Sequence, residues 1–350
     1  MTAAGMQPSA EDRYARQIRF APIGSDGQRR LANSSAVIVG LGALGSVIAQ
    51  HLVRSGVGRL RLIDRDIVEW SNLQRQTLYN EEDVRRTMPK AEAAAAHLRA
   101  VNRAVAIEPV SADLSAANVE ELLGGYPLIL DGTDNMTVRY LINEYSVKNG
   151  IPWIYGGAVG SGGMTMTFVP GETPCLRCLF PELPAAGDLD TCETAGVFSP
   201  VVDIVGSLQA AEALKWLSGN RQAMRKELVQ VDVWTNGWMP LAANTGKRGD
   251  CPTCALRRFE MLEGGGVHAS TRLCGKQTVQ IIPPGRPQLS LDGLAARLAL
   301  AGPVERNPYL VKLRVRETLT FILFPDGRAL IQGTDDPAVA RSVYAELLGV

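Results

Sequence analysis

The chain has 350 residues, with 36 Lys and Arg against 36 Asp and Glu, so its formal net charge is zero at neutral pH. This length predicts a main domain and a smaller one, because it exceeds the usual size of a single core. The balanced charge, without a long basic run, excludes a nucleic-acid partner. No segment approaches about 18 uninterrupted apolar residues and the N-terminus lacks a signal-peptide core. We therefore expect a soluble, cytoplasmic protein without a membrane partner.

The first two thirds of the chain alternate strand and helix patterns. Strands are predicted at 35–40, 59–64, 106–112 and 127–134, and helices at 44–56, 89–102 and 136–149. This alternation predicts an α/β fold with a doubly wound, mostly parallel, Rossmann-like sheet. Strands at 152–159, 162–170 and 226–234, with a helix at 201–219, should complete that sheet.

The composition changes towards the C-terminus. From about residue 268 the pattern reads strand, helix, three strands and helix, at 276–284, 291–302, 309–315, 319–324, 328–334 and 336–349. We therefore expect a large domain over residues 1–262 and an added small α+β domain, without an assigned role, over residues 268–350.

A glycine-rich turn follows the first strand. Gly40, Gly42 and Gly45 form G-x-G-x-x-G before a helix, where small residues let a phosphate approach the positive helix end. Asp64 closes the next strand 19 residues after Gly45, a position that suits a hydrogen bond to ribose. The combination predicts a nucleotide site but does not separate NAD from ATP, so an NAD-dependent oxidoreductase stays open.

Polar residues then gather behind that acid. They are Asp66, Asn72, Arg75, Gln76 and Lys90. A triphosphate needs several such cations and amide donors, whereas a dinucleotide on a glycine loop needs fewer. Each residue alone would also fit a solvated surface, but together they favour ATP.

A buried strand ends in Asp131 and Asp134, at the edge of the sheet where ligands of such folds lie. Asp134 is a candidate Mg²⁺ ligand or a carboxylate that holds an arginine. It could also be the N-cap of the next helix, and these roles are compatible.

Two C-x-x-C pairs stand apart in the sequence. Cys175 and Cys178 form the first, and Cys251 and Cys254 the second, 73 residues after Cys178. Four thiolates on turn-rich loops predict a closed, structural Zn²⁺ site rather than redox dithiols. Cys274 has no partner by spacing and is expected to be a small buried apolar residue.

Several segments resemble the bacterial E1-like adenylyltransferases of the ThiF/MoeB/HesA type, which activate the sulfur carriers of molybdopterin and thiamine biosynthesis. The resemblance covers roughly residues 10–257 and rests on YARQIRF, GLGALG, LIDRDIVEWSNLQRQTLY, PKAEA, DGTDN, PCLRCLFPE and TCETAGVFSPVVDIVGSLQAAEALK. It implies a nucleotidyltransferase that uses ATP and Mg²⁺ to adenylate the C-terminal Gly-Gly carboxylate of a ubiquitin-like sulfur carrier. Pyrophosphate is released, and the product serves cofactor biosynthesis or tRNA thiolation.

The resemblance also implies roles for single residues. The nucleotide-contacting positions and their motif neighbours are Gly40, Gly42, Gly45, Asp64, Asp66, Asn72, Arg75, Gln76, Lys90, Asp134 and Asn135. Arg16 falls on an arginine that reaches the phosphates of the opposite subunit, which implies a homodimer. Arg75, Lys90, Arg16 and a Mg²⁺ near Asp134 would carry catalysis by neutralising charge. No general base is required, because the attacking carboxylate is already ionised.

Cys192 falls on a cysteine that forms a covalent link to the carrier in some family members, whereas other members release the adenylate to a separate enzyme. Both roles stay open here.

Because no cysteine follows Cys274, sulfur is expected from a separate sulfurtransferase or cysteine desulfurase. The sequence does not name the carrier, and a nucleotide-regulated module that binds a carrier without activating it remains an alternative.

Two stretches depart from the family pattern. The segment DVRRTMPK before Lys90 is longer than the usual glycine-containing approach, and Asp203 lies in a segment that the family usually keeps apolar.

Overall fold

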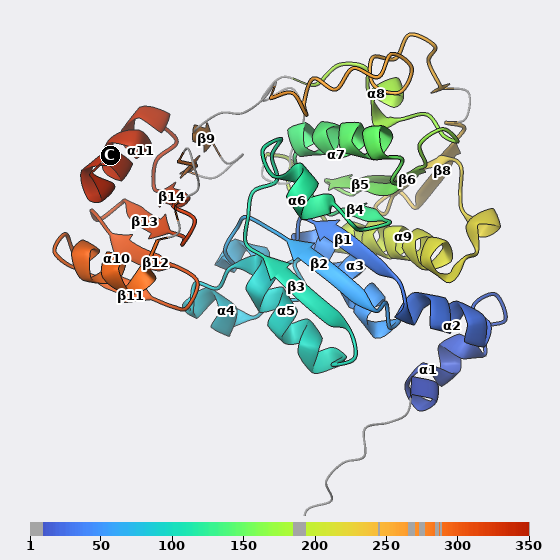
Figure 1. Ribbon diagram of the computed structural model, residues 1–350, viewed down its shortest axis with the longest axis horizontal. Coiled ribbons are helices and arrows are strands. Elements are labelled where there is room, and N and C mark those ends of the chain that lie inside the picture. Colours follow the sequence, from blue (N-terminus) through green and yellow to red (C-terminus); the bar gives the residue numbers. More distant parts are fainter. Residues whose placement is uncertain are drawn as a thin grey trace, which may run out of the picture. The chain divides into compact units, whose positions relative to one another are not determined.

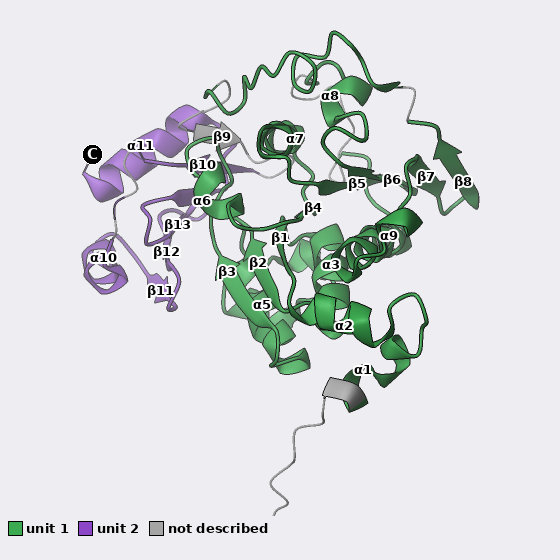
Figure 2. Ribbon diagram, turned by 45° about the vertical axis from the view of Figure 1, so that its right-hand side comes forward, with its two compact units in different colours: residues 1–265 green, residues 266–350 purple. Residues whose placement is uncertain are grey.

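A computed structural model describes residues 10–184, 194–243, 246–264, 270–272, 277–283, 287 and 289–349 (Figure 1). Cys192 and Cys274 therefore lie outside the described residues. The chain divides into two compact units, residues 1–265 and 266–350, which Figure 2 colours separately. Each unit is described by itself.

The first unit is built on an eight-stranded sheet. Its order is β3 (Ala106–Val110), β2 (Arg59–Ile63), β1 (Ser35–Val39), β4 (Ile129–Asp131), β5 (Trp153–Val159), β6 (Gly162–Phe168), β7 (Leu228–Asp232) and β8 (Gly237–Leu241). The five strands from β3 to β5 are parallel, and β6, β7 and β8 continue the sheet antiparallel. The predicted doubly wound, mostly parallel α/β sheet is confirmed.

Helices surround this sheet. They are α1 (Ala10–Ile18), α2 (Gly24–Ala32), α3 (Ala43–Arg54), α4 (Glu81–Arg85), α5 (Lys90–Val101), α6 (Val119–Leu123), α7 (Met136–Asn149), α8 (Leu176–Leu179) and α9 (Ser199–Ser218), with 3₁₀ turns η1 (Trp70–Asn72) and η2 (Arg221–Ala223).

The central strands are apolar because both faces of the sheet are covered. On one face, Val37 and Val39 of β1 share a buried cluster with Leu122 of α6 and Tyr140 of α7. Helices α3 and α9 pack against each other, and Figure 1 shows α9 and α7 on opposite sides of the sheet. In the described part of the chain, no helix is both long and apolar enough to cross a membrane.

The expectation that the strand at 226–234 completes the sheet is wrong, because β8 follows as an edge strand. All five residues of β8 are exposed, so the strand shows no alternation of buried and exposed residues. It contains Pro240, which a sheet tolerates only at an edge.

The second unit is a small α+β fold, as expected. Its antiparallel sheet has the order β11 (Val304–Arg306), β12 (Val311–Arg314), β13 (Thr320–Leu323), β14 (Ala329–Gln332), β10 (Thr278–Ile281) and β9 (Ser270–Arg272). Residues of α10 (Leu291–Leu298) and α11 (Pro337–Leu348) join one face of this sheet in a separate buried core. The sequence missed β9 and β11, since three residues are too few for a period-2 pattern.

Candidate functional site

Three loops meet at the carboxyl ends of neighbouring parallel strands in the first unit. Strand β1 lies between β2 and β4, and the loops that follow these strands begin at Gly40, Asp64 and Gly132. Along the chain, β2 and β3 are added on one side of β1, and β4 and β5 are then added on its other side. Folds of this kind bind ligands in the crevice at such a reversal of strand order.

The three predicted glycines have different tasks. Gly40 has a φ of +84°, and a Cβ there would lie 2.8 Å from the backbone of Gly132. A Cβ at Gly45 would lie 1.9 Å from the carbonyl oxygen of Gly40. Gly40 therefore lets the loops after β1 and β4 pack closely, and Gly45 lets the first turn of α3 approach the loop after β1.

Gly42 has no such packing reason. A Cβ there would meet no atom nearer than 3.8 Å, the distance to Nε2 of Gln76. Gly42 is the N-cap of α3, whose first turn has no side-chain cap and no acidic residue. Open space beside unpaired helical N–H groups suits an anionic ligand.

Asp64 joins the β1 loop to the β2 loop. Its two carboxylate oxygens accept hydrogen bonds from the backbone N–H of Leu41, at 2.6 Å, and of Asp66, at 2.7 Å. Burial raises the pKa of this carboxyl, while the nearby Lys90 ammonium lowers it. Each oxygen retains a lone pair, so the carboxylate can still accept a hydrogen bond from a ribose hydroxyl.

Lys90 is the first residue of α5 and is only 4% exposed. Its Nζ lies 3.2 Å from Oδ2 of Asp66. The long segment before Lys90 turns back through Thr87, whose φ is +49°, and the Val68 N–H then donates to the Met88 carbonyl at 2.8 Å. Although the segment DVRRTMPK departs from the family pattern, Lys90 lies near Asp64 and Asp66, the two acids predicted for the site.

Asn72, Arg75 and Gln76 belong to one compact turn. The Asn72 Oδ1 accepts from the Glu69 N–H at 3.0 Å, and the Asn72 carbonyl accepts from the N–H groups of Arg75 and Gln76. Arg75 is half-buried and donates from Nη1 to the Ser71 carbonyl at 2.9 Å. The buried Oε1 of Gln76 has no hydrogen-bond partner among the described residues. Asn72 therefore shapes the turn that presents Arg75 and Gln76.

Asp134 is exposed and makes no hydrogen bond within the described part of the chain. The N-cap of α7 is Asn135, which accepts from the Val138 N–H at 3.3 Å, so the N-cap role considered for Asp134 is wrong. Asp134 interacts electrostatically with the guanidinium groups of Arg65 and Arg139. Its carboxylate is available to a cation at the end of β4.

A buried network that the sequence analysis missed fixes this loop. Arg139 donates from Nε to Asp131 at 2.9 Å and from Nη2 to the carbonyls of Thr133 and Gly156. Gln209, on α9, donates to the Asp131 carbonyl at 2.7 Å. Arg139 follows Asp131 by eight residues, outside the i+3 and i+4 spacings of helical contacts, so no local pattern was a signal for the first contact. Gln209 had none either, because only the tertiary fold brings it here.

Arg16 lies on α1, apart from these loops, and is exposed. The helix is anchored by Tyr14, whose hydroxyl accepts from Asn102 Nδ2 at 2.8 Å, and by Gln17, which donates to the Ser55 carbonyl at 3.0 Å. Arg16 has no hydrogen bond among the described residues. An anchored helix with a free arginine can serve a neighbouring molecule.

Asp203, the second departure from the family pattern, lies on α9 and is half-buried. It interacts electrostatically with His51 of α3, whose Nε2 is 3.3 Å from Ser207 Oγ. Its charge thus belongs to polar contacts between α3 and α9 and not to the nucleotide edge.

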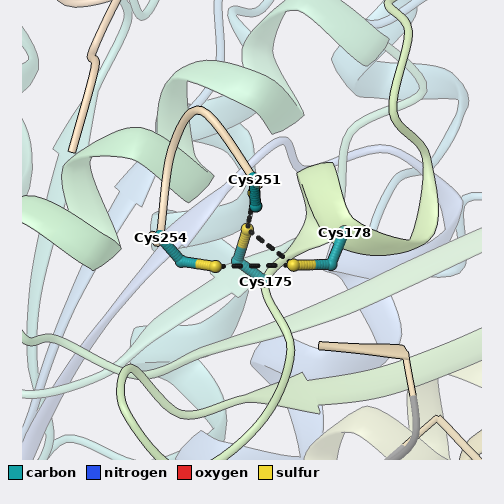
Figure 3. Close-up of side chains that lie close together, drawn as sticks. All are labelled: Cys175, Cys178, Cys251 and Cys254. Carbon is teal, nitrogen blue, oxygen red and sulfur yellow. Dashed lines mark hydrogen bonds between the residues drawn. The ribbon is translucent and has the colours of Figure 1, made fainter. Parts of the chain in front are cut away.

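The four cysteines of the C-x-x-C pairs converge, as Figure 3 shows. The Sγ atoms of Cys175 and Cys251 are 3.6 Å apart, those of Cys178 and Cys254 3.4 Å, and those of Cys175 and Cys178 3.9 Å. All four lie within 4.8 Å of one another. Tetrahedral Zn–S bonds of about 2.3 Å require S–S separations of about 3.8 Å. The cluster fits zinc.

The surroundings of the cysteines also suit a thiolate–metal centre. Burial raises the pKa of Cys175 and raises that of Cys254 to about 12, so without a metal these groups would be neutral thiols. Cys175 and Cys254 line a cavity of about 450 Å³ together with Lys148, Lys247 and Arg257. No acidic residue is among its described lining residues, and the cations offset the negative charge of a tetrathiolate centre.

Comparisons with known proteins agree with this geometry. The model of the ThiF family matches residues 14–253. The chain is 45% identical over 338 residues to the sulfur carrier protein ThiS adenylyltransferase of Bacillus subtilis, an alignment that covers 96% of this chain and 99% of that protein. It is 40% identical over 246 residues to the molybdopterin-synthase adenylyltransferase of Escherichia coli, covering 69% of this chain and 95% of that protein.

Two further similarities bear on size and fold. The chain is 40% identical over 252 residues to the SAMP-activating enzyme E1 of Haloferax volcanii, covering 72% of this chain and 92% of that protein. The crystal structure of E. coli MccB with ATP matches with a TM-score of 0.61 and 22% identity, over 70% of this chain and 75% of that one. The latter supports the fold alone.

Proposed function

Because the chain belongs to the ThiF family, we propose that it adenylates the C-terminal Gly-Gly carboxylate of a ubiquitin-like sulfur carrier with ATP, releasing pyrophosphate. The observation that carries this function is the similarity to a ThiS adenylyltransferase along nearly the whole of both chains. That similarity also favours a ThiS-type carrier over a molybdopterin-type one. If the chain were an NAD-dependent oxidoreductase, the cations Arg75 and Lys90 near the glycine loop would have no functional explanation.

The chemistry requires charge neutralisation and orientation more than proton transfer. A carrier carboxylate oxygen attacks the α-phosphorus and forms a mixed anhydride, while the bond to the β-phosphate breaks and pyrophosphate leaves with the electron pair. Two anions approach each other in this step, so fixed positive charge lowers the barrier.

We assign the phosphates to the open space over Gly42 and the first turn of α3, with Arg75 and Lys90 as the cations. Asp64 would bind the ribose, and Gln76 would offer its unpaired amide. Bound Mg²⁺ would supply further positive charge to the phosphates, and Asp134 is the residue that would hold it. The four cysteines would hold a structural Zn²⁺.

An apolar patch beside the nucleotide edge suits the folded part of the carrier. The patch consists of Phe198, Trp234 and Trp238, which are 41% to 74% exposed. The rings of Phe198 and Trp234 lie 5.7 Å apart, edge to face. Exposed aromatic clusters of this kind mark protein interaction sites.

The register of the sheet supports the carrier as the partner that binds this patch. Asp232, at the end of β7, pairs with Gly162, which pairs with Val159 at the carboxyl end of β5. The β7–β8 turn with Trp234 therefore lies at the same edge of the sheet as Asp134. A carrier bound there can extend its C-terminal tail along that edge to the α-phosphate.

The patch can be tested separately from the chemistry. We expect Trp234→Ala and Trp238→Ala to raise the KM for the carrier while ATP binding stays unchanged. Leu300→Ala is the matched control, because Leu300 is 91% exposed and lies in the second unit. An unchanged KM in both tryptophan variants would remove the patch from the binding surface.

We propose a homodimer in which Arg16 reaches the site of the partner subunit, and a separate sulfurtransferase or cysteine desulfurase that delivers sulfur. Cys192 lies outside the described residues, so its covalent role stays a prediction. ATP consumption and reduced zinc thiolates fit a cytoplasmic location.

The reaction itself can be tested by intact-protein mass spectrometry. A ThiS-type carrier incubated with the protein, ATP and Mg²⁺ should gain the mass of AMP, and a carrier without its final glycine should not. ATP binding without any adenylated carrier would contradict the proposed reaction and favour a non-activating binding module.

A further inference from the structure

One row of residues on α7 runs from the nucleotide edge to the cysteine cluster. Asn135, Arg139, Asn143 and Val147 follow one another at intervals of four and therefore share a face of the helix. At the first end, Asn135 caps the helix and Arg139 binds Asp131. At the other end, Val147 packs in one cluster with Cys175, Cys178 and Cys251.

Asn143 is the residue of this row that contacts the cysteine loop. It is 1% exposed, and its Oδ1 accepts from the Leu176 N–H at 2.8 Å. Leu176 follows Cys175 directly, so the side-chain amide lies beside that sulfur. Its Nδ2 has no conventional hydrogen-bond partner among the described residues.

A metal-bound thiolate at Cys175 would satisfy that amide. Asn143 and Cys175 line the same cavity, so a thiolate there would be an acceptor for the Nδ2 group that has none among the described residues. A buried donor without an acceptor destabilises the fold, and a negatively charged sulfur is a strong acceptor. The arrangement is thus favourable with a thiolate ligand in place and unfavourable without one.

A second buried residue of α7 holds the other cysteine loop. Glu144 is 1% exposed and accepts hydrogen bonds from the N–H groups of Met261, at 2.8 Å, and Leu262, at 3.2 Å. The segment that follows Cys251 and Cys254 is therefore also attached to α7. Both halves of the metal site depend on the position of this helix.

We propose that Asn143 is a positioning residue of the metal centre and that α7 transmits metal occupancy to the loop Asp131–Asn135. A loaded centre holds Cys175 against Asn143, and the same helix holds Asp131 through Arg139. Loss of the metal frees one end of α7 and loosens the loop at the other.

The test compares the full-length, metal-loaded wild type with Asn143→Ala. Chelator competition measures zinc affinity, and hydrogen exchange measures protection of the amides in residues 131–139. Removing a group that supports a metal ligand typically lowers affinity roughly 10- to 100-fold, and we expect that loss in Asn143→Ala. The same variant should exchange faster over residues 131–139, as should the wild type after chelation.

Asn149→Ala is the matched control, because Asn149 lines the same cavity from the last turn of α7 but donates to the carbonyl of Tyr145 and not to the cysteine loop. It should bind zinc and exchange as the wild type does. Asn143→Asp, which keeps the acceptor for Leu176 but loses the donor, should fold and still lose zinc affinity. Wild-type zinc affinity in both Asn143 variants would overturn the positioning role. Lower zinc affinity with unchanged exchange over residues 131–139 would overturn the coupling.

Discussion

Lys90 and Asp134 differ in how far the fold constrains them. Lys90 is buried against Asp66 and near Asp64, whereas Asp134 is exposed without a hydrogen bond in the described part of the chain. The lysine therefore serves the fold as well as a ligand, whereas the aspartate contributes to the fold only through electrostatic interactions with Arg65 and Arg139. Substitution should separate these two cases.

We expect Asp134→Ala and Arg75→Ala to abolish carrier adenylation while unfolding and zinc content remain those of the wild type. Lys90→Ala should also lose activity, but in addition it should destabilise the fold by about 1–3 kcal/mol, because it removes a buried ammonium that pairs with Asp66 and offsets the charge of the buried Asp64. Urea unfolding, zinc analysis and adenylation of the carrier distinguish the outcomes. A fully active Asp134→Ala protein would remove Asp134 from the mechanism.

Glu108 on β3 gives a pH-dependent contribution to stability. Hydrogen bonds from Arg61, with smaller contributions from Arg59 and Tyr126, lower its pKa to about 2. Because the folded pKa is depressed, the contribution is present above the unfolded value of about 4.3 and is lost as pH falls towards 2. The side chain is 40% exposed, so solvent screening limits the effect to about 1 kcal/mol or less.

The variant Glu108→Gln should therefore unfold at lower urea than the wild type at pH 7, and the difference should narrow by pH 3. Comparing the two proteins at each pH cancels the acid loss of the metal that both share. A difference that is constant between pH 7 and pH 3 would contradict the assigned cause.

At the scale of single elements, alanine substitutions at two glycines of the loop after β1 separate a packing role from a ligand-binding role. A Cβ at Gly45 would lie 1.9 Å from the Gly40 carbonyl oxygen, whereas a Cβ at Gly42 would meet nothing within 3.8 Å. Gly45→Ala should therefore misfold or unfold easily, and Gly42→Ala should fold with a loss of at most about 1 kcal/mol. We expect Gly42→Ala to bind ATP more weakly by titration calorimetry. Wild-type ATP affinity in this variant would mean that the phosphates lie elsewhere.

The sequence predicted the elements that have strong local patterns. The parallel strands, α3, α5, α7 and α9 carry long apolar runs or regular periods, whereas β8, β9 and β11 are short or exposed and were missed. The candidate site followed the same rule. Residues in sequence motifs, such as Gly42 and Lys90, lie at the nucleotide edge, but Gln209 and Asn143 act through tertiary contacts that no local pattern encodes.

At the scale of the whole molecule, the two units have separate buried cores. The E. coli relative aligns over 95% of its own length yet covers only 69% of this chain, so it has no counterpart for most of the remainder. We therefore expect a protein truncated after residue 264 to fold, to retain zinc and to adenylate the carrier. Loss of adenylation in the folded, zinc-loaded truncation would assign the second unit a part in the reaction.

The proposed dimer can be tested by mixing two inactive variants. If Arg16 acts on the partner's site, an Arg16→Ala protomer and an Asp134→Ala protomer together form one intact site. Co-refolding or co-expression of the two should then restore part of the activity that each lacks alone. If Arg16 acts within its own subunit, no mixture regains activity.

The most direct test of the adenylation reaction is ATP–pyrophosphate exchange with Mg²⁺ and each Gly-Gly-terminated carrier of the same organism. We predict exchange that depends on the ThiS-type carrier and that disappears when its final glycine is removed. Exchange with none of the carriers, in protein that binds ATP and holds zinc, would contradict carrier adenylation as the function.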